Sequence, residues 1–197
     1  MTQTPTKRLT LEEFLNLPET TPASEYLDGD IIQKPMPQGK HSLLQRELSF
    51  AITLAFKPEQ TAQAFPELRC TYPSGSHPTD VYGGRSIVPD IAVFLTQRIP
   101  RDPNGQVANS FNTAPDWIIE ILSPQQSQTQ VIRNIFHSLD HGTEMGWLLD
   151  PEESFIFVYG ADKSVQGFEA TETILPVPAF AEAVQLRADE IFAWLQA

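Results

Sequence analysis

The spacing of apolar residues predicts four helices. Residues 41–56 carry an apolar side chain every three or four positions, which is the period of an amphipathic helix. A capping box over residues 10–13 begins a short helix near the N-terminus, and a second box over residues 127–130 begins another. Gly142 is expected to end that second helix, and residues 186–195 predict a final amphipathic helix.

Strand patterns alternate with these helices. Five segments are short, apolar and bounded by turn residues, as strands are: residues 25–34, 64–72, 87–95, 117–122 and 145–159. The first and the last are expected to be hairpins, with Asp28-Gly29 as the tight turn of the first. Because strands, hairpins and helices are interleaved, the pattern predicts an α/β fold with a mixed central sheet.

Two polar segments separate the strands. Residues 73–85 are rich in Gly, Ser and Pro, and residues 96–116 form a longer stretch that contains Pro, Asn and Gly. Loops of the second length are uncommon inside a compact domain and often carry function. With 197 residues, of which 41% are hydrophobic, the chain is expected to form one domain over residues 1–197.

Composition narrows the classes of partner. The chain has 13 Lys and Arg against 25 Asp and Glu, a net charge of −12, so bulk charge cannot hold nucleic acid or an anionic membrane. A local patch or a bound cation must do so. The single cysteine, Cys70, excludes an internal disulfide and a cysteine-based zinc site. Without a secretory pattern or an apolar run near ~18 residues, we expect a cytosolic protein with no membrane partner.

Two carboxylates stand out because they lie inside apolar strands. Glu120 lies in the run WIIEIL, where both faces of the strand are apolar, so its side chain is expected to be buried. Asp90 follows Pro89 in IVPDIAVF, and its side chain is also expected to be buried, though less completely because proline can mark a strand end. An unpaired buried carboxylate costs several kcal/mol, so each needs a cation, a basic partner or a proton.

A divalent metal ion would satisfy both carboxylates with the fewest groups. Neighbouring strands lie ~4.8 Å apart, which lets Asp90 and Glu120 share one hard cation. Mg²⁺ prefers few carboxylates and several waters, and Mn²⁺ suits the same ligands. The alternatives are a strand-end cap by Asp90 and, for Glu120, a buried ion pair with one of three arginines: Arg69, Arg85 or Arg133. Taken together, the two acids favour the metal site.

Further candidate residues flank these acids. Glu25 begins the first hairpin, and His41 lies on the inward face of its helix at the N-terminal end. Packing or capping is the ordinary role of a histidine in that place. Three arginines in or beside the polar segments are candidate phosphate contacts: Arg85, Arg98 and Arg101. The alternative is that these three arginines are ordinary solvated residues in loops.

Four segments, in this order, carry a family resemblance: EYLDGDIIQKPMPQGKH, VPDIAVF, PDWIIEILSP and GWLLDP. They closely resemble the Uma-type putative restriction endonucleases, a former domain of unknown function that belongs to the PD-(D/E)XK nuclease superfamily. The resemblance runs over about residues 9–195. The order and spacing of four segments make it far more specific than a lone Pro-Asp dipeptide.

The resemblance implies a restriction-endonuclease-like fold, in which helices flank a mixed central sheet, and a Mg²⁺-dependent phosphodiesterase site. By that resemblance, Asp90 matches the acid of the first element and Glu120 the acid of the second. The carbonyl of Ile121 would be a further metal ligand. Glu25 and His41 match acidic and histidine positions that recur in the family.

The lysine of the superfamily is missing from its usual place. Two residues after the second acid stands Leu122, and the position from which relatives supply a lysine on the following helix is Asn134. Lys34 and Lys40 are the lysines near the site segments, and Lys40 is the candidate assigned to the site. If neither lysine reaches the site, there are two alternatives. Gln130 and Asn134 position a water molecule there, or the protein has lost most of its catalytic activity.

Three functions follow from these residues. The first is a metal-dependent nuclease, using Mg²⁺ or Mn²⁺, that hydrolyses DNA. The second is a catalytically silent nuclease-like module that binds nucleic acid or a protein. The third is a metal-dependent hydrolase of another phosphoester. Since a two-fold dimer commonly cuts both strands of a duplex, a homodimer is expected for the first function.

Overall fold

The computed structural model describes residues 8–72, 82–124 and 126–196. Its helices are α1 (Leu11–Leu15), α2 (Gly39–Phe56), α3 (Gln128–Asp140) and α4 (Ala188–Ala193), and short 3-10 turns lie at Thr96–Arg98, Ala179–Ala181 and Trp194–Gln196. Its strands are β1 (Ser24–Leu27), β2 (Asp30–Gln33), β3 (Ala62–Pro66), β4 (Cys70–Tyr72), β5 (Arg85–Ile87), β6 (Ile91–Leu95), β7 (Trp117–Ile121), β8 (Met145–Asp150), β9 (Phe155–Gly160) and β10 (Val165–Glu169).

Six of the described strands form the larger sheet, in the order β10-β9-β8-β7-β6-β3. Neighbouring strands are antiparallel except β7 and β8, which run parallel. A parallel pair needs a crossover connection, and α3 provides it between these two strands. Every residue of β7 is buried, as its apolar sequence predicted.

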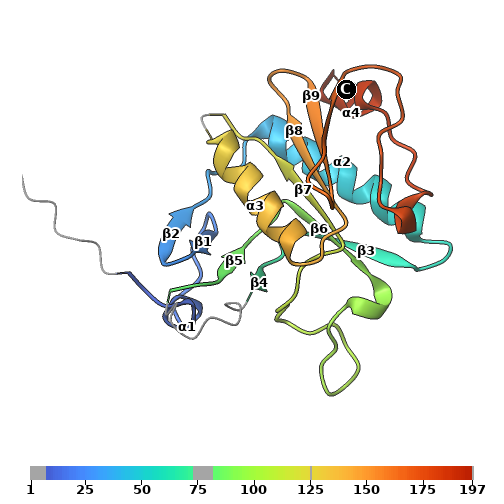
Figure 1. Cartoon of the computed structure of the whole chain (residues 1–197). Coiled ribbons are helices and arrows are strands. Elements are labelled where there is room, and N and C mark those ends of the chain that lie inside the picture. The colour runs from blue at the N-terminus through green and yellow to red at the C-terminus, as the bar shows by residue number, and fades with distance from the viewer. Residues whose placement is uncertain (1–7, 73–81, 125, 197) are drawn as a thin grey trace, which may run out of the picture.

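Helices cover both faces of the larger sheet, with α2 and α3 on opposite sides (Figure 1). Successive side chains of a strand point to opposite faces. Ile119 of β7 therefore belongs to the same apolar cluster as Leu48 of α2, whereas its neighbour Ile118 packs with Ile135 of α3. The predicted mixed α/β class is confirmed. No helix in the described ranges is both long and apolar enough to cross a membrane.

The other four described strands form a smaller sheet, in the order β2-β1-β5-β4, and the chain passes between the sheets three times. The sequence predicted one strand over residues 64–72 and one over 87–95, and each is broken into two. Glu67 has a positive φ of 51°, which turns the chain between β3 and β4. Pro89 lies between β5 and β6, where a residue without an N–H cannot continue a ladder.

Two elements differ in detail from the sequence prediction. Strand β10 was not predicted, because its alternation is interrupted by Gly167 and its residues are mostly exposed. The final helix is shorter than residues 186–195, since only Ala188–Ala193 is α-helical. Gly142, with a φ of 102°, follows the end of α3 as predicted. Most of the predicted loop 73–85 lies outside the described residues.

Candidate active site

The passage from β5 to β6 supplies backbone groups to a cluster of buried polar side chains. Val88 has left the ladder of the smaller sheet, so its N–H and its carbonyl need partners from elsewhere. The N–H donates to Oε1 of Glu25, at 2.9 Å, and the carbonyl accepts from Nζ of Lys34, at 2.7 Å. The break beside Pro89 thus fixes one side chain from β1 and one from the end of β2.

Asp90 and Glu120 lie opposite each other across β6 and β7. The antiparallel register pairs Ile91 with Ile119, so the next residues along the two chains face each other. The N–H of Asp90 lies 3.4 Å from Oε2 of Glu120, and the N–H of Ile121 donates to Oδ2 of Asp90 at 2.7 Å. Both acids are buried, at 1% and 4% exposure. Asp90, directly before β6, and Glu120, in β7, are thus brought together.

Lys34 supplies the cation of this cluster. It follows β2, and its Nζ lies 2.6 Å from Oδ1 of Asp90. The side chains of the pair are 11% and 2% exposed. Burial by itself lowers the pKa of Lys34, but the surrounding carboxylates, with Asp90 first and Glu120 second, outweigh burial and raise it. The ammonium is therefore charged at neutral pH.

Two side chains of α2 hold Asp90 from the other side. His41, in the first turn of the helix, places Nε2 3.1 Å from Oδ2 of Asp90. Gln45, one turn later, donates from Nε2 to the backbone carbonyl of Asp90 at 2.8 Å and to Oε1 of Glu67 at 3.0 Å. Nδ1 of His41 is buried and has no hydrogen-bond partner among the described residues.

The acids of the cluster differ in their preferred charge. Burial raises the pKa of Asp90, but Lys34 and then His41 outweigh burial and lower it to about 2. Burial, and after it the charge of Asp90, raises the pKa of Glu120 well above its usual range. Burial likewise raises the pKa of Glu25. Asp90 is thus the firmly ionised member, and Glu120 holds a proton more readily.

Asn134 reaches the same cluster from α3. Its Nδ2 donates to Oε2 of Glu25 at 3.1 Å, and the residue is 4% exposed. Glu25 and His41 both approach Asp90 and its neighbours, as the sequence predicted. The alternative in which an arginine neutralises Glu120 is not realised, because no described arginine forms an ion pair with it.

Lys40 is the sequence candidate that does not join Asp90. Its Nζ pairs with Oε1 of Glu152 at 2.9 Å, and both side chains are more than half exposed. One residue along a helix is a turn of about 100°, so Lys40 and His41 point to different sides of α2. Lys34, which the sequence offered beside Lys40, is the lysine in the cluster.

The arginines predicted to contact phosphate have other partners. Arg85 donates to Oδ2 of Asp28, at 3.2 Å, and Arg98 forms an ion pair with the buried carboxylate of Asp116. Both therefore brace loops of the protein. Arg101 is exposed and, among the described residues, forms no ion pair. Contact of these residues with DNA stays a prediction.

The acid pair fits a hard divalent cation with a small set of protein ligands. Glu120 has one long contact, from the N–H of Asp90, so its buried carboxylate is poorly satisfied by the protein. No group of three His, Cys, Asp or Glu side chains in the described parts of the chain could hold a metal ion. Mg²⁺ uses one or two carboxylates and keeps several waters, which matches such a pair.

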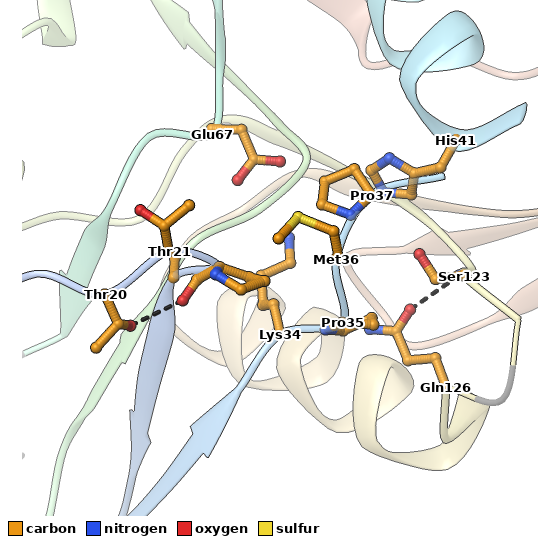
Figure 2. A pocket seen from close by; sticks show the side chains of 12 residues that line it. Thr20, Thr21, Lys34, Pro35, Met36, Pro37, His41, Glu67, Ser123 and Gln126 are labelled. Carbon is orange, nitrogen blue, oxygen red and sulfur yellow. Dashed lines mark hydrogen bonds between the residues drawn. The ribbon is translucent and has the colours of Figure 1, made fainter. Parts of the chain in front are cut away.

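Two cavities open beside His41. One, of about 170 Å³, is lined by Lys34, His41 and the residues around them (Figure 2). The other, of about 310 Å³, is lined by His41, Lys40 and Leu122 among others. Among the described residues, these two cavities reach Lys34 and His41 of the charged cluster on either side of the start of α2.

Comparison with known proteins places this site in a family. A model of the Uma2 family, described as "Putative restriction endonuclease", matches residues 11–189. The crystal structure of a putative nuclease of family DUF820 from Anabaena variabilis is similar to the whole fold, with 53% sequence identity and a TM-score of 0.88 over 95% of this chain and 99% of that one. No curated protein matches. The restriction-endonuclease-like fold is confirmed, and the chain belongs to the Uma2 family.

Proposed function

We propose that this protein is a Mg²⁺-dependent nuclease of the PD-(D/E)XK type that hydrolyses phosphodiester bonds of DNA. The observation that carries the proposal is a buried cluster of three charged side chains. The N–H of Asp90 lies 3.4 Å from Oε2 of Glu120, and Nζ of Lys34 lies 2.6 Å from Oδ1 of Asp90. Membership of a family described as "Putative restriction endonuclease" supports the same reaction.

Asp90 and Glu120 are the residues that would hold the metal ion, with the carbonyl of Ile121 as the further ligand that the family resemblance implies. Bound there, Mg²⁺ or Mn²⁺ would polarise the scissile phosphate and lower the pKa of a water molecule. In the hydrolysis, a water oxygen forms a new bond to phosphorus, the bond from phosphorus to the leaving sugar oxygen breaks, and that oxygen takes up a proton.

Lys34 has the role of the lysine that is absent after Glu120. Because carboxylates raise its pKa, the ammonium is protonated and acts as a hydrogen-bond donor that stabilises negative charge, rather than as a base. The N–H of Ile121 and Nε2 of His41 hold the second oxygen of Asp90, which fixes the carboxylate against rotation. Such positioning residues prepare the site before substrate binds.

The proposal is tested with labelled DNA oligonucleotides in Mg²⁺, in Mn²⁺ and in EDTA. The wild type is expected to cut with either metal and not in EDTA, and Asp90→Asn and Glu120→Gln are expected to lose cleavage. Hydrolysis of a small phosphodiester such as bis-p-nitrophenyl phosphate, without cleavage of DNA, would favour the hydrolase of another phosphoester. Binding of metal and DNA without cleavage would instead identify a silent module.

An exchange of lysines tests the role of Lys34. Lys34→Met is expected to lower cleavage by ~10²-fold or more, the usual scale for a lost charge-stabilising donor. Adding Asn134→Lys should restore part of it, because position 134 reaches Glu25 of the same cluster from α3. Lys57→Met, which alters an exposed lysine at the other end of α2, is the matched control and should cut like the wild type. Full activity of Lys34→Met would refute the assignment. The homodimer expected for a double-strand cut stays a prediction.

A further inference from the structure

The two cavities beside His41 follow each other between the same two stretches of chain. Residues 35–40 form the first wall: Pro35, Met36 and Pro37 line one cavity, and Gln38, Gly39 and Lys40 line the other. The segment after β7 forms the second wall: Ser123 and Gln126 line the first cavity, and Leu122 and Pro124 line the second. We name the two cavities together the 35–40 groove; Figure 2 shows the first of them.

Lys34 and His41, the two side chains that contact the carboxylate of Asp90, line the 35–40 groove, whereas the acids themselves are buried. Asp90 and Glu120 are 1% and 4% exposed, and the Lys34 side chain is 11% exposed. Residues 20–23 narrow the first cavity further. A phosphate between the walls therefore meets Lys34 and His41, the side chains that contact Asp90. The phosphates of a duplex lie on a stiff rod, whereas an unpaired strand bends and can be drawn into a narrow groove.

The charge of the surface also disfavours a duplex. Affinity for duplex DNA comes mainly from contacts of Lys and Arg with several phosphates. Among the described Lys and Arg residues, all except Lys57, Arg101 and Arg133 form an ion pair with a carboxylate of this chain. The chain as a whole has a net charge of −12. Lys34 and Lys40 line the groove, each beside a carboxylate of this chain, so the groove offers cations to only a short stretch of one strand.

We infer that the substrate is an unpaired DNA strand, which lies along the 35–40 groove with its scissile phosphate over Lys34 and His41. This inference rests on the proposed nuclease function and specifies its substrate class. One strand needs one site, so a single chain suffices for each cut. A duplex would become a substrate only where its strands are locally separated, as at a flap, a gap or a melted end.

Binding in the presence of Ca²⁺ separates this inference from catalysis. The probes are a fluorescein-labelled dT12 strand and the same strand annealed to dA12, followed by fluorescence anisotropy at one salt concentration. We expect the unpaired strand to bind at least about tenfold more tightly. Equal or tighter binding of the duplex, or no binding of either probe, would overturn the inference. Failure to cut a strand that binds would instead refute the proposed function and leave this inference standing.

A charge placed in the groove tests its location. A Cβ added at Gly39 meets no atom within 4 Å, and α2 has no acidic residue in its first turn, so Gly39→Glu suits the helix N-terminus. The new carboxylate faces the path of the phosphates, and we expect dT12 to bind at least about tenfold more weakly. Val165→Glu, on the exposed edge strand β10, is the matched control and should bind like the wild type. Unchanged affinity of Gly39→Glu would overturn the groove assignment.

Discussion

Lys34→Met is expected to destabilise the metal-free protein strongly. At 2.6 Å from Asp90 Oδ1, and with an effective dielectric constant of ~20, the attraction between the two charges is about 6 kcal/mol before desolvation is subtracted. Removing one partner of a buried pair typically costs ~3–5 kcal/mol, because the other charge is left without compensation. Met keeps the apolar part of the chain, so the loss reports the ammonium alone.

The free energy of unfolding can be followed in urea by tryptophan fluorescence. Trp117 and Trp147 are fully buried, with ring centroids 4.7 Å apart, and report the opening of the main apolar cluster. For a chain of this size, a loss of ~3–5 kcal/mol corresponds to a fall in Tm of roughly 6–20 °C. The free energy should be measured at pH 7 without divalent metal.

Lys40→Met makes the comparison decisive. It removes the same group from an ion pair of 2.9 Å, but there both partners are more than half exposed, and such pairs are worth about 0.5 kcal/mol or less. A Lys34→Met protein within about 1 kcal/mol of the wild type, or no more destabilised than Lys40→Met, would show that Lys34 does not neutralise Asp90. The assignment of the site cation would then be wrong.

Three further predictions concern charge and packing. Glu120→Gln should stabilise the metal-free protein more at pH 8 than at pH 5. Burial raises the pKa of Glu120 in the folded protein, so the wild type loses stability as the pH rises from the usual pKa of a glutamate through the folded-state value, and the amide does not. Equal effects of the substitution on the urea midpoint at both pH values would contradict this. Arg98→Ala should lower the free energy of unfolding by about 1–3 kcal/mol, which is less than for a fully buried ion pair because Arg98 is one-third exposed. An unaltered urea midpoint would show that the ion pair with Asp116 does not stabilise the fold. Gly146→Ala should cost about 1–3 kcal/mol, since the new Cβ meets Ile135 Cγ2, and the penalty should shrink when measured in an Ile135→Ala background.

The breaks in two predicted strands show where local pattern stops being informative. Residues 64–72 and 87–95 are apolar enough for continuous strands, but each crosses from one sheet to the other. Pro89 was a visible warning in the sequence, whereas the positive φ of Glu67 was not. These crossings matter for function, because the unpaired backbone groups of Val88 bind Glu25 and Lys34.

The sequence by itself determined the acid pair. Apolar residues on both faces of β7 required Glu120 to be buried, and a buried carboxylate demands a cation or a proton wherever it lies in a fold. The capping boxes and the period of α2 likewise predicted the helices that carry His41 and Asn134, since these signals depend only on residues a few positions apart.

Only the tertiary structure decided which lysine serves the acids. Lys34 and Lys40 are six residues apart and equally near the site segments in sequence. The N–H of Lys34 donates to the carbonyl of Ala23 at the end of the first hairpin. This hydrogen bond directs the side chain of Lys34 toward Asp90, 56 residues further along the chain. Lys40, on α2, instead faces Glu152. The choice depends on how distant segments pack, and residue spacing along one segment carries no information about that packing.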